Sequence, residues 1–356
     1  MAAVVGLVAC GGSTPPPRSG ASAPRGHATL VGVTKSSLSD SALEPAAADA
    51  AKTEDWPRAE ELYRELARRQ PRNAGAKRGL GIALVRQGRD NPEKNAEAIS
   101  AFEASLRIEE DARTRLELAG AFGALGRFPS ALPHLRRAVE LAPREPAAWT
   151  QLAQALLKVE KPDGASEALR ASASACPPCA SDDAWNRTNE DVARAFHAKA
   201  IKQLGSGDAS GAQKSADLAV ALRPNLPETQ LVVGKVARAQ GNTKAAATAY
   251  RKAIQGLPDA KADAGATARL ELATLLLSNG DGAAEATKLA EDVLAARGDD
   301  ATALDTLGRA CDATRDTNCA RNAYGKLVKL SAGGAPTKEA LAHARVRVKE
   351  LKSRRH

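Results

Sequence analysis

Apolar positions in the middle of the chain follow the period of an α-helix, in two successive runs. The apolar positions of the first run are Leu116, Ala119, Phe122 and Gly123. This run ends at Gly126. The second run has Ala131, Leu135, Ala138 and Val139 on one face. It stops before Pro143, because proline cannot continue a helix. The pattern predicts two helices joined by a short turn, with small residues that allow a close approach.

The same pattern returns after 34 residues. The matched pairs are Pro143 and Pro177, Leu118 and Leu152, Ala119 and Ala153, Ala131 and Ala165, and Leu135 and Leu169. A fixed period of this length is typical of a repeat array. One helical hairpin cannot bury its apolar face alone, so neighbouring units must stack.

This spacing resembles the tetratricopeptide repeat family. The copy that begins at Pro146 has Trp149 at repeat position 4 and Pro177 at position 32. The resemblance implies an all-α fold, a right-handed α-solenoid of about eight helix-turn-helix repeats whose inner surface is lined by the first helices. A C-terminal capping helix is expected to close it.

The pattern divides the chain into six parts. We expect a lipoprotein signal peptide over 1–10, a flexible Gly/Ser/Pro tether over 11–39, units one to four over 40–179, a break in the period over 180–192, units five to eight over 193–334 and a basic capping helix over 335–356. The turn of unit two is lengthened by about five residues, at 91–95. The outer side of the capping helix carries Arg345, Arg347, Lys349 and Lys352.

Composition narrows the function. Aromatic residues are 3% of the chain, so the core must consist of Leu, Val and Ala, and the net charge of +9 favours an anionic partner or surface. The sequence lacks a phosphate-binding GxxxxGK[ST] loop, GxSxG and HExxH. It also lacks aromatics interleaved with its basic residues. We therefore expect no enzyme, no cofactor, no metal and no nucleic-acid partner.

The first ten residues are apolar and end in Leu7-Val8-Ala9-Cys10. This resembles a bacterial lipobox, and the resemblance implies acylation of Cys10 at the periplasmic face of the outer membrane. No Lys or Arg precedes the apolar run, which departs from the usual signal. The alternative is a chance cysteine on a cytoplasmic adaptor protein. The run is too short to span a bilayer.

Four further cysteines form two close pairs. Cys311 and Cys319 flank the turn of one predicted hairpin, and a disulfide there contributes roughly 2–3 kcal/mol. Cys176 and Cys179 form a CxxC at a helix end and also suit a disulfide in an exported protein. A redox pair or half of a zinc site remains the alternative, without the βαβ context or second pair that these need.

In the family, certain positions of each first helix face the concave surface. Carried over, they give the candidate binding residues Arg78, Arg113, Gln154, Arg194, His197, Lys235, Arg238 and Arg309. The acids at such positions are fewer, namely Glu228, Asp305 and Asp312. The hypothesis is a basic groove that binds an acidic or extended segment of an envelope protein during assembly or secretion. The alternative is an ordinary solvated face.

Overall fold

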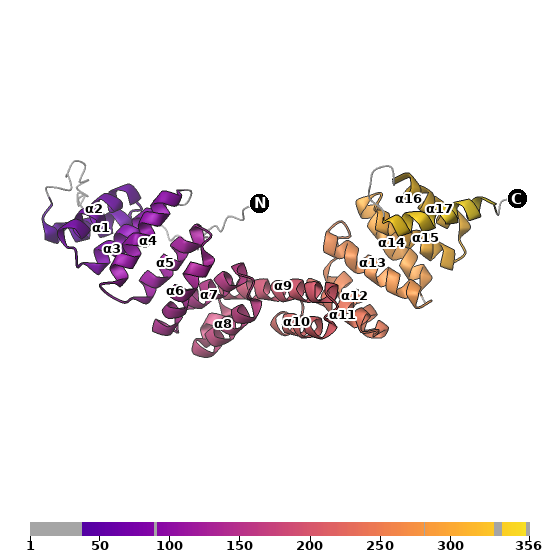
Figure 1. The fold of residues 1–356 in the computed structure, drawn as a ribbon, viewed down its shortest axis with the longest axis horizontal. Helices are drawn as coiled ribbons and strands as arrows, with labels where there is room; N and C mark the ends of the chain where they lie inside the picture. Colours follow the sequence, from indigo (N-terminus) through magenta and orange to yellow (C-terminus); the bar gives the residue numbers. More distant parts are fainter. Residues whose placement is uncertain (1–37, 89–90, 281, 331–336, 354–356) are drawn as a thin grey trace, which may run out of the picture.

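The computed structural model describes residues 38–88, 91–280, 282–330 and 337–353 (Figure 1). Within these ranges it contains helices and no strand. The first eight helices are α1 (Asp40–Lys52), α2 (Trp56–Arg69), α3 (Ala74–Gln87), α4 (Pro92–Leu106), α5 (Ala112–Ala124), α6 (Phe128–Leu141), α7 (Pro146–Lys158) and α8 (Pro162–Ala175). The others are the 3-10 helix η2 (Pro177–Ser181), α9 (Asp183–Gly205), α10 (Ala209–Leu222), α11 (Pro227–Ala239), α12 (Thr243–Gly256), α13 (Asp263–Ser278), α14 (Ala283–Arg297), α15 (Ala301–Ala313), α16 (Thr317–Leu330) and α17 (Lys338–Ser353).

Successive α-helices form hairpins that stack along an elongated, arched array (Figure 1). Helices α1 to α16 make eight hairpins, and α17 packs against α16 at the end of the array. Each hairpin packs on the next one, which is how a repeat array buries its apolar faces. The expected all-α solenoid with a terminal helix is therefore confirmed.

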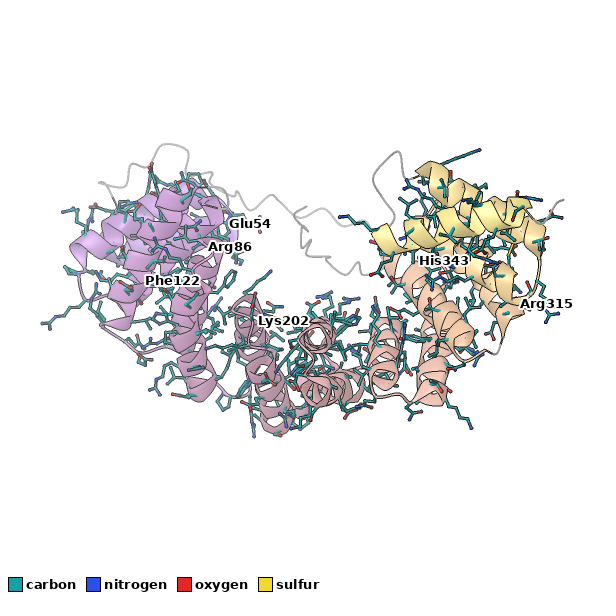
Figure 2. All side chains as sticks on the ribbon, turned by 45° about the vertical axis from the view of Figure 1, so that its right-hand side comes forward. Glu54, Arg86, Phe122, Lys202, Arg315 and His343 are labelled. Carbon is teal, nitrogen blue, oxygen red and sulfur yellow. A yellow bond between two sulfur atoms is a disulfide. The ribbon has the colours of Figure 1, made fainter. Side chains whose placement is uncertain are left out.

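Seven of the eight hairpins have a left-handed backbone residue among the described residues of the turn. Gly126, Gly207, Gly241 and Gly280 have φ between 69° and 81° at this place. Other hairpins place a non-glycine residue there: Glu54, Glu160 and Arg315 have φ of 57–60°. Figure 2 labels Glu54 and Arg315 in the first and last hairpins. The same turn geometry thus persists where the sequence lacks its glycine signal.

Large aromatic side chains pack on glycines of the facing helix. Tyr250 and Tyr324 are fully buried, and their rings cover Gly234 and Gly308. A Cβ added at either glycine would lie 2.4 Å from the ring, so only hydrogen fits there. Although aromatics are scarce, these contacts place them at the centre of the hairpins.

Two irregular stretches of the repeat pattern lie largely in helices. Residues 92–95 are the first turn of α4 and not a lengthened loop, and Asn91 caps this helix by accepting from the backbone N–H groups of Glu93 and Lys94. Residues from Asp183 onward extend α9, a helix of 23 residues that runs across the 180–192 interruption. The extra residues lengthen one helix because Asp182 caps it early, by accepting from the N–H of Ala184.

Helix α9 joins the two halves of the array. It packs against α7 and α8 on one side of the junction and against α10 and α11 on the other. It is also the longest helix, and no described helix is both long and apolar enough to cross a bilayer. The predicted signal peptide, Cys10 and nearly all of the predicted tether lie outside the described residues.

Candidate functional site

A groove of about 930 Å³ lies over α5 and α7, the first helices of hairpins three and four. Its apolar and small lining residues include Leu116, Ala119, Gly120, Gly123, Phe128, Ala147 and Ala155. A Cβ added at Gly120 would meet no atom within 4 Å, so the lining is open to solvent at that point. The groove therefore has an apolar floor with room for a side chain from outside.

The polar lining of this groove carries charges of both signs. The acidic residues are Asp111, Glu117, Glu145 and Asp191, and the basic residues are Arg113 and Lys158. Asp111 also caps α5, accepting from the N–H and hydroxyl of Thr114 at 2.8 and 2.7 Å. These hydrogen bonds, together with Arg78, lower the pKa of Asp111 although partial burial opposes them. The groove consequently offers anionic and cationic contacts side by side.

Two predicted binding residues, Arg113 and Gln154, line this groove. Gln154 donates from Nε2 to the Thr188 hydroxyl at 3.1 Å, which ties α7 to α9. Arg113 is exposed, and within the described ranges no carboxylate lies within 4.0 Å of its guanidinium. Gln151 is half-buried in the same lining and was not predicted from the sequence.

The other predicted cations form ion pairs with acidic neighbours of this chain. Arg78 pairs with Asp111 at 3.2 Å. Lys235 and Arg238 both pair with Glu271 on α13, the former at 3.5 Å. The structure therefore does not present these residues as unpaired cations on one surface.

The pairs that involve Arg194 and Arg309 are local. Arg194 Nη2 lies 2.5 Å from Glu190 Oε1 on α9, and Arg309 Nε lies 2.9 Å from Asp305 Oδ2 on α15. Both side chains are about half exposed, so these pairs hold the guanidinium groups weakly.

His197 lies half-buried on α9. Burial lowers the pKa of its imidazole below the ordinary value of 6.5, and this outweighs the opposite effect of Glu228. The ring is therefore held neutral at pH 7. It does not line the groove over α5 and α7.

The acidic residues that pair with these cations can be identified from their spacing in the sequence. Arg78 and Asp111 are 33 residues apart, as are Arg238 and Glu271, and Arg251 and Glu285 are 34 apart. Opposite charges separated by about one repeat meet on neighbouring hairpins. A search for such pairs identifies Glu271 and Asp111, whereas choosing residues by repeat position alone does not.

The C-terminal cysteines form the predicted disulfide. Cys311 and Cys319 are bonded, with their Cα atoms 5.8 Å apart across the α15–α16 turn. Cys176 also takes part in a disulfide. The side chain of Cys179, its predicted partner, lies outside the described side chains. In the described part of the chain no group of three or more His, Cys, Asp or Glu residues is arranged to hold a metal ion.

Comparison with known proteins agrees with the repeat pattern. Models of the tetratricopeptide repeat match residues 45–113 and 112–155. An all-α array of stacked hairpins with a concave groove is the architecture that such repeats build. Residues 45–155 of this chain therefore consist of tetratricopeptide repeats. A search of curated proteins finds no match.

Solved structures with the same kind of fold include several repeat proteins. The C-terminal part of a tetratricopeptide repeat-containing protein from Cytophaga hutchinsonii is 14% identical with a TM-score of 0.49, over 73% of this chain and 98% of that one. Yeast Tom70 is 16% identical with a TM-score of 0.40, over 85% and 60%. YrrB, described as having an unusual peptide-binding site, is 23% identical with a TM-score of 0.37, over 51% and 86%.

The repeats and the open groove together define the class of function. A protein of this family with a solvent-open groove on its first helices is a scaffold for protein–protein interaction.

Proposed function

We propose that this chain is a scaffold attached to the bacterial envelope through a lipid on Cys10, and that the groove over α5 and α7 binds an extended segment of a partner protein. The observation that carries the groove part is its 930 Å³ volume on the first helices. The Leu7-Val8-Ala9-Cys10 motif and the Gly/Ser/Pro-rich segment after it support the anchor.

The groove lining can contact both the backbone and the side chains of a bound segment. Gln151 offers both a donor and an acceptor, which matches the amide groups of an extended segment. The floor around Gly120 accepts an apolar side chain. Because four carboxylates and two cations line the groove, the preferred segment carries charges of both signs. Of the acidic or extended segment that the repeat positions suggest, this favours an extended one of mixed charge.

The proposed role is to hold envelope proteins together during assembly or secretion. The described units from α1 to α16 offer a continuous array, and repeat arrays present extended surfaces to their partners. The disulfide between Cys311 and Cys319 in the α15–α16 hairpin suits a protein of an oxidising compartment.

The groove is tested by photo-crosslinking in intact cells. A photoreactive phenylalanine derivative replaces Gln151 in the groove or, as the matched control, Arg136 on the exposed face of α6. We expect an adduct with an envelope protein from position 151 and not from position 136. Equal adducts from both positions, or none, would contradict the groove as the binding site.

The anchor is tested separately. Mass spectrometry of the N-terminal peptide is expected to find acyl chains on Cys10, and Cys10→Ser is expected to release the protein from the membrane fraction. An unmodified Cys10 in a cytoplasmic protein with free thiols would support the adaptor alternative and leave the groove proposal standing.

A further inference from the structure

The positive charge of this protein is concentrated outside the repeat hairpins. Residues 40–334 contain 41 Lys and Arg against 40 Asp and Glu, whereas residues 335–356 contain seven against two. The hairpins are thus nearly neutral, and the C-terminal segment supplies more than half of the net charge of +9. The anionic partner that this net charge suggests is best sought at α17.

Helix α17 presents a line of cations to solvent. Lys338, Arg345 and Lys349 are exposed and follow one another at spacings of seven and four residues. At 100° per residue they fall within a narrow arc, and they extend over about 16 Å of helix. Within the described residues, no carboxylate lies within 4.0 Å of any of these three cations.

The opposite face of α17 fixes the direction of this stripe. Ala344 and Leu351 are buried in the core formed with α15 and α16. Arg347, which the sequence pattern placed on the outer side, turns inward: its Nη2 and Nε donate to Asp312 on α15 at 2.6 and 2.9 Å. His343, which is labelled in Figure 2, packs edge-on against Tyr324 with ring centroids 5.3 Å apart. The helix is held firmly, so the cations point away from the array.

An exposed apolar side chain lies outside this stripe. Val346 is 55% exposed, the most exposed large hydrophobic residue in the described part of the chain. It lies about 100° around the helix from Arg345, in line with the exposed Glu339 and Glu350. The three cations therefore define the basic face without an apolar contribution.

We propose that the outer face of α17, formed by Lys338, Arg345 and Lys349, binds an anionic phospholipid surface. Helix α17 is the last described helix and packs against α16 and α15, so within the described residues no later hairpin follows it. A straight row of cations without a pocket matches an extended anionic surface better than a folded partner of defined shape. Because the apolar side of α17 is already buried, the contact is electrostatic at the surface and does not insert the helix.

The test is flotation with vesicles of phosphatidylcholine alone or mixed with phosphatidylglycerol. The full chain is used in a Cys10→Ser background, so that no acyl chain contributes and the outcome is independent of the anchor. We expect binding to the anionic vesicles only, weakened by salt. Lys338→Gln, Arg345→Gln and Lys349→Gln together are expected to weaken it about 100-fold, about fivefold for each cation.

The matched control removes the same charge from the hairpins. Lys244, Lys252 and Lys288 are exposed on α12 and α14, and their joint replacement by Gln leaves the net charge equal to that of the α17 variant. This control is expected to bind vesicles within about twofold of the parent. An equal loss in both variants would overturn the proposal, since net charge and not α17 would then control binding.

An acidic polypeptide is the rival occupant. Polyglutamate serves as the probe for it, added to the same three proteins. Binding of polyglutamate that depends on the α17 cations, with no binding to anionic vesicles, would overturn the lipid proposal and assign the face to an acidic protein.

Discussion

The contact between Tyr324 and Gly308 gives a sharp test of how the hairpins pack. The ring is fully buried, and a Cβ added at Gly308 would lie 2.4 Å from its Cε1. The ring has little freedom to retreat, because its hydroxyl donates to Asp312 at 3.0 Å and its edge packs on His343. The substitution Gly308→Ala therefore overfills the hairpin.

A second glycine of the same hairpin supplies the control. Gly325 lies inside α16, and a Cβ there meets no atom within 4 Å. Replacing glycine by alanine in a helix interior gains about 1 kcal/mol from helix propensity in both variants. Overpacking costs about 1–3 kcal/mol in Gly308→Ala alone. We expect Gly325→Ala to stabilise by about 1 kcal/mol, and Gly308→Ala to be about 1–3 kcal/mol less stable than Gly325→Ala.

The assay combines urea unfolding, followed by far-UV circular dichroism, with hydrogen exchange of the α15–α16 amides. Local exchange is needed because a repeat array does not unfold in a single step. The expected result is slower exchange in Gly325→Ala than in the parent, and faster exchange in Gly308→Ala than in Gly325→Ala. Protection in Gly308→Ala that equals or exceeds that in Gly325→Ala would refute the close packing of glycine and ring.

Three further predictions concern other elements of the array. Glu160→Gly is expected to stabilise the α7–α8 hairpin by about 0.5–1 kcal/mol in urea titrations, because Glu160 has φ of 57°; a loss of stability would contradict the strain. The Cys311–Cys319 disulfide closes a short loop, so its reduction is expected to lower the stability of the last hairpin by about 2.5 kcal/mol. Unchanged amide hydrogen exchange at α15 after reduction would argue against this. Burial lowers the pKa of His197, so the stability due to this residue is present above pH 6.5 and is lost as the pH falls toward the folded-state pKa. His197→Gln should therefore make the urea midpoint depend less on pH between 7.5 and 5. An unaltered pH dependence would contradict the burial of His197 as a neutral ring.

The repeat period made most of the fold predictable from the sequence. Positions such as Ala119 and Ala131 face the core in every copy, so their spacing defines both helices and the turn between them. The structure at the 180–192 break was harder to predict from the sequence. Extra residues lengthen a helix there, which disturbs the period without any helix-breaking residue. Only the capping Asp182 marks where α9 begins.

The charges of the candidate site were less predictable. Repeat positions placed Lys235 and Arg238 on the concave side, and they lie on α11 as expected. Their partner Glu271 lies on α13, the first helix of the next hairpin, but outside the repeat positions that are expected to face the groove. Arg347 differs from its expected place for the same reason, since Asp312 on α15 draws it inward. Ion pairs between hairpins depend on three-dimensional neighbours that helical periodicity does not report.

The groove itself is tested most directly by filling it. Gly120→Trp places a large ring in the open space over α5, and Gly325→Trp places the same ring on α16, away from the groove. Both variants are panned against a library of displayed peptides, beside the parent protein. If the groove is the binding site, peptides selected by the parent bind Gly325→Trp normally and lose at least about tenfold in affinity for Gly120→Trp, which corresponds to about 1.4 kcal/mol. Equal affinity for the two variants would contradict the groove over α5 and α7 as the place where this scaffold holds its partner.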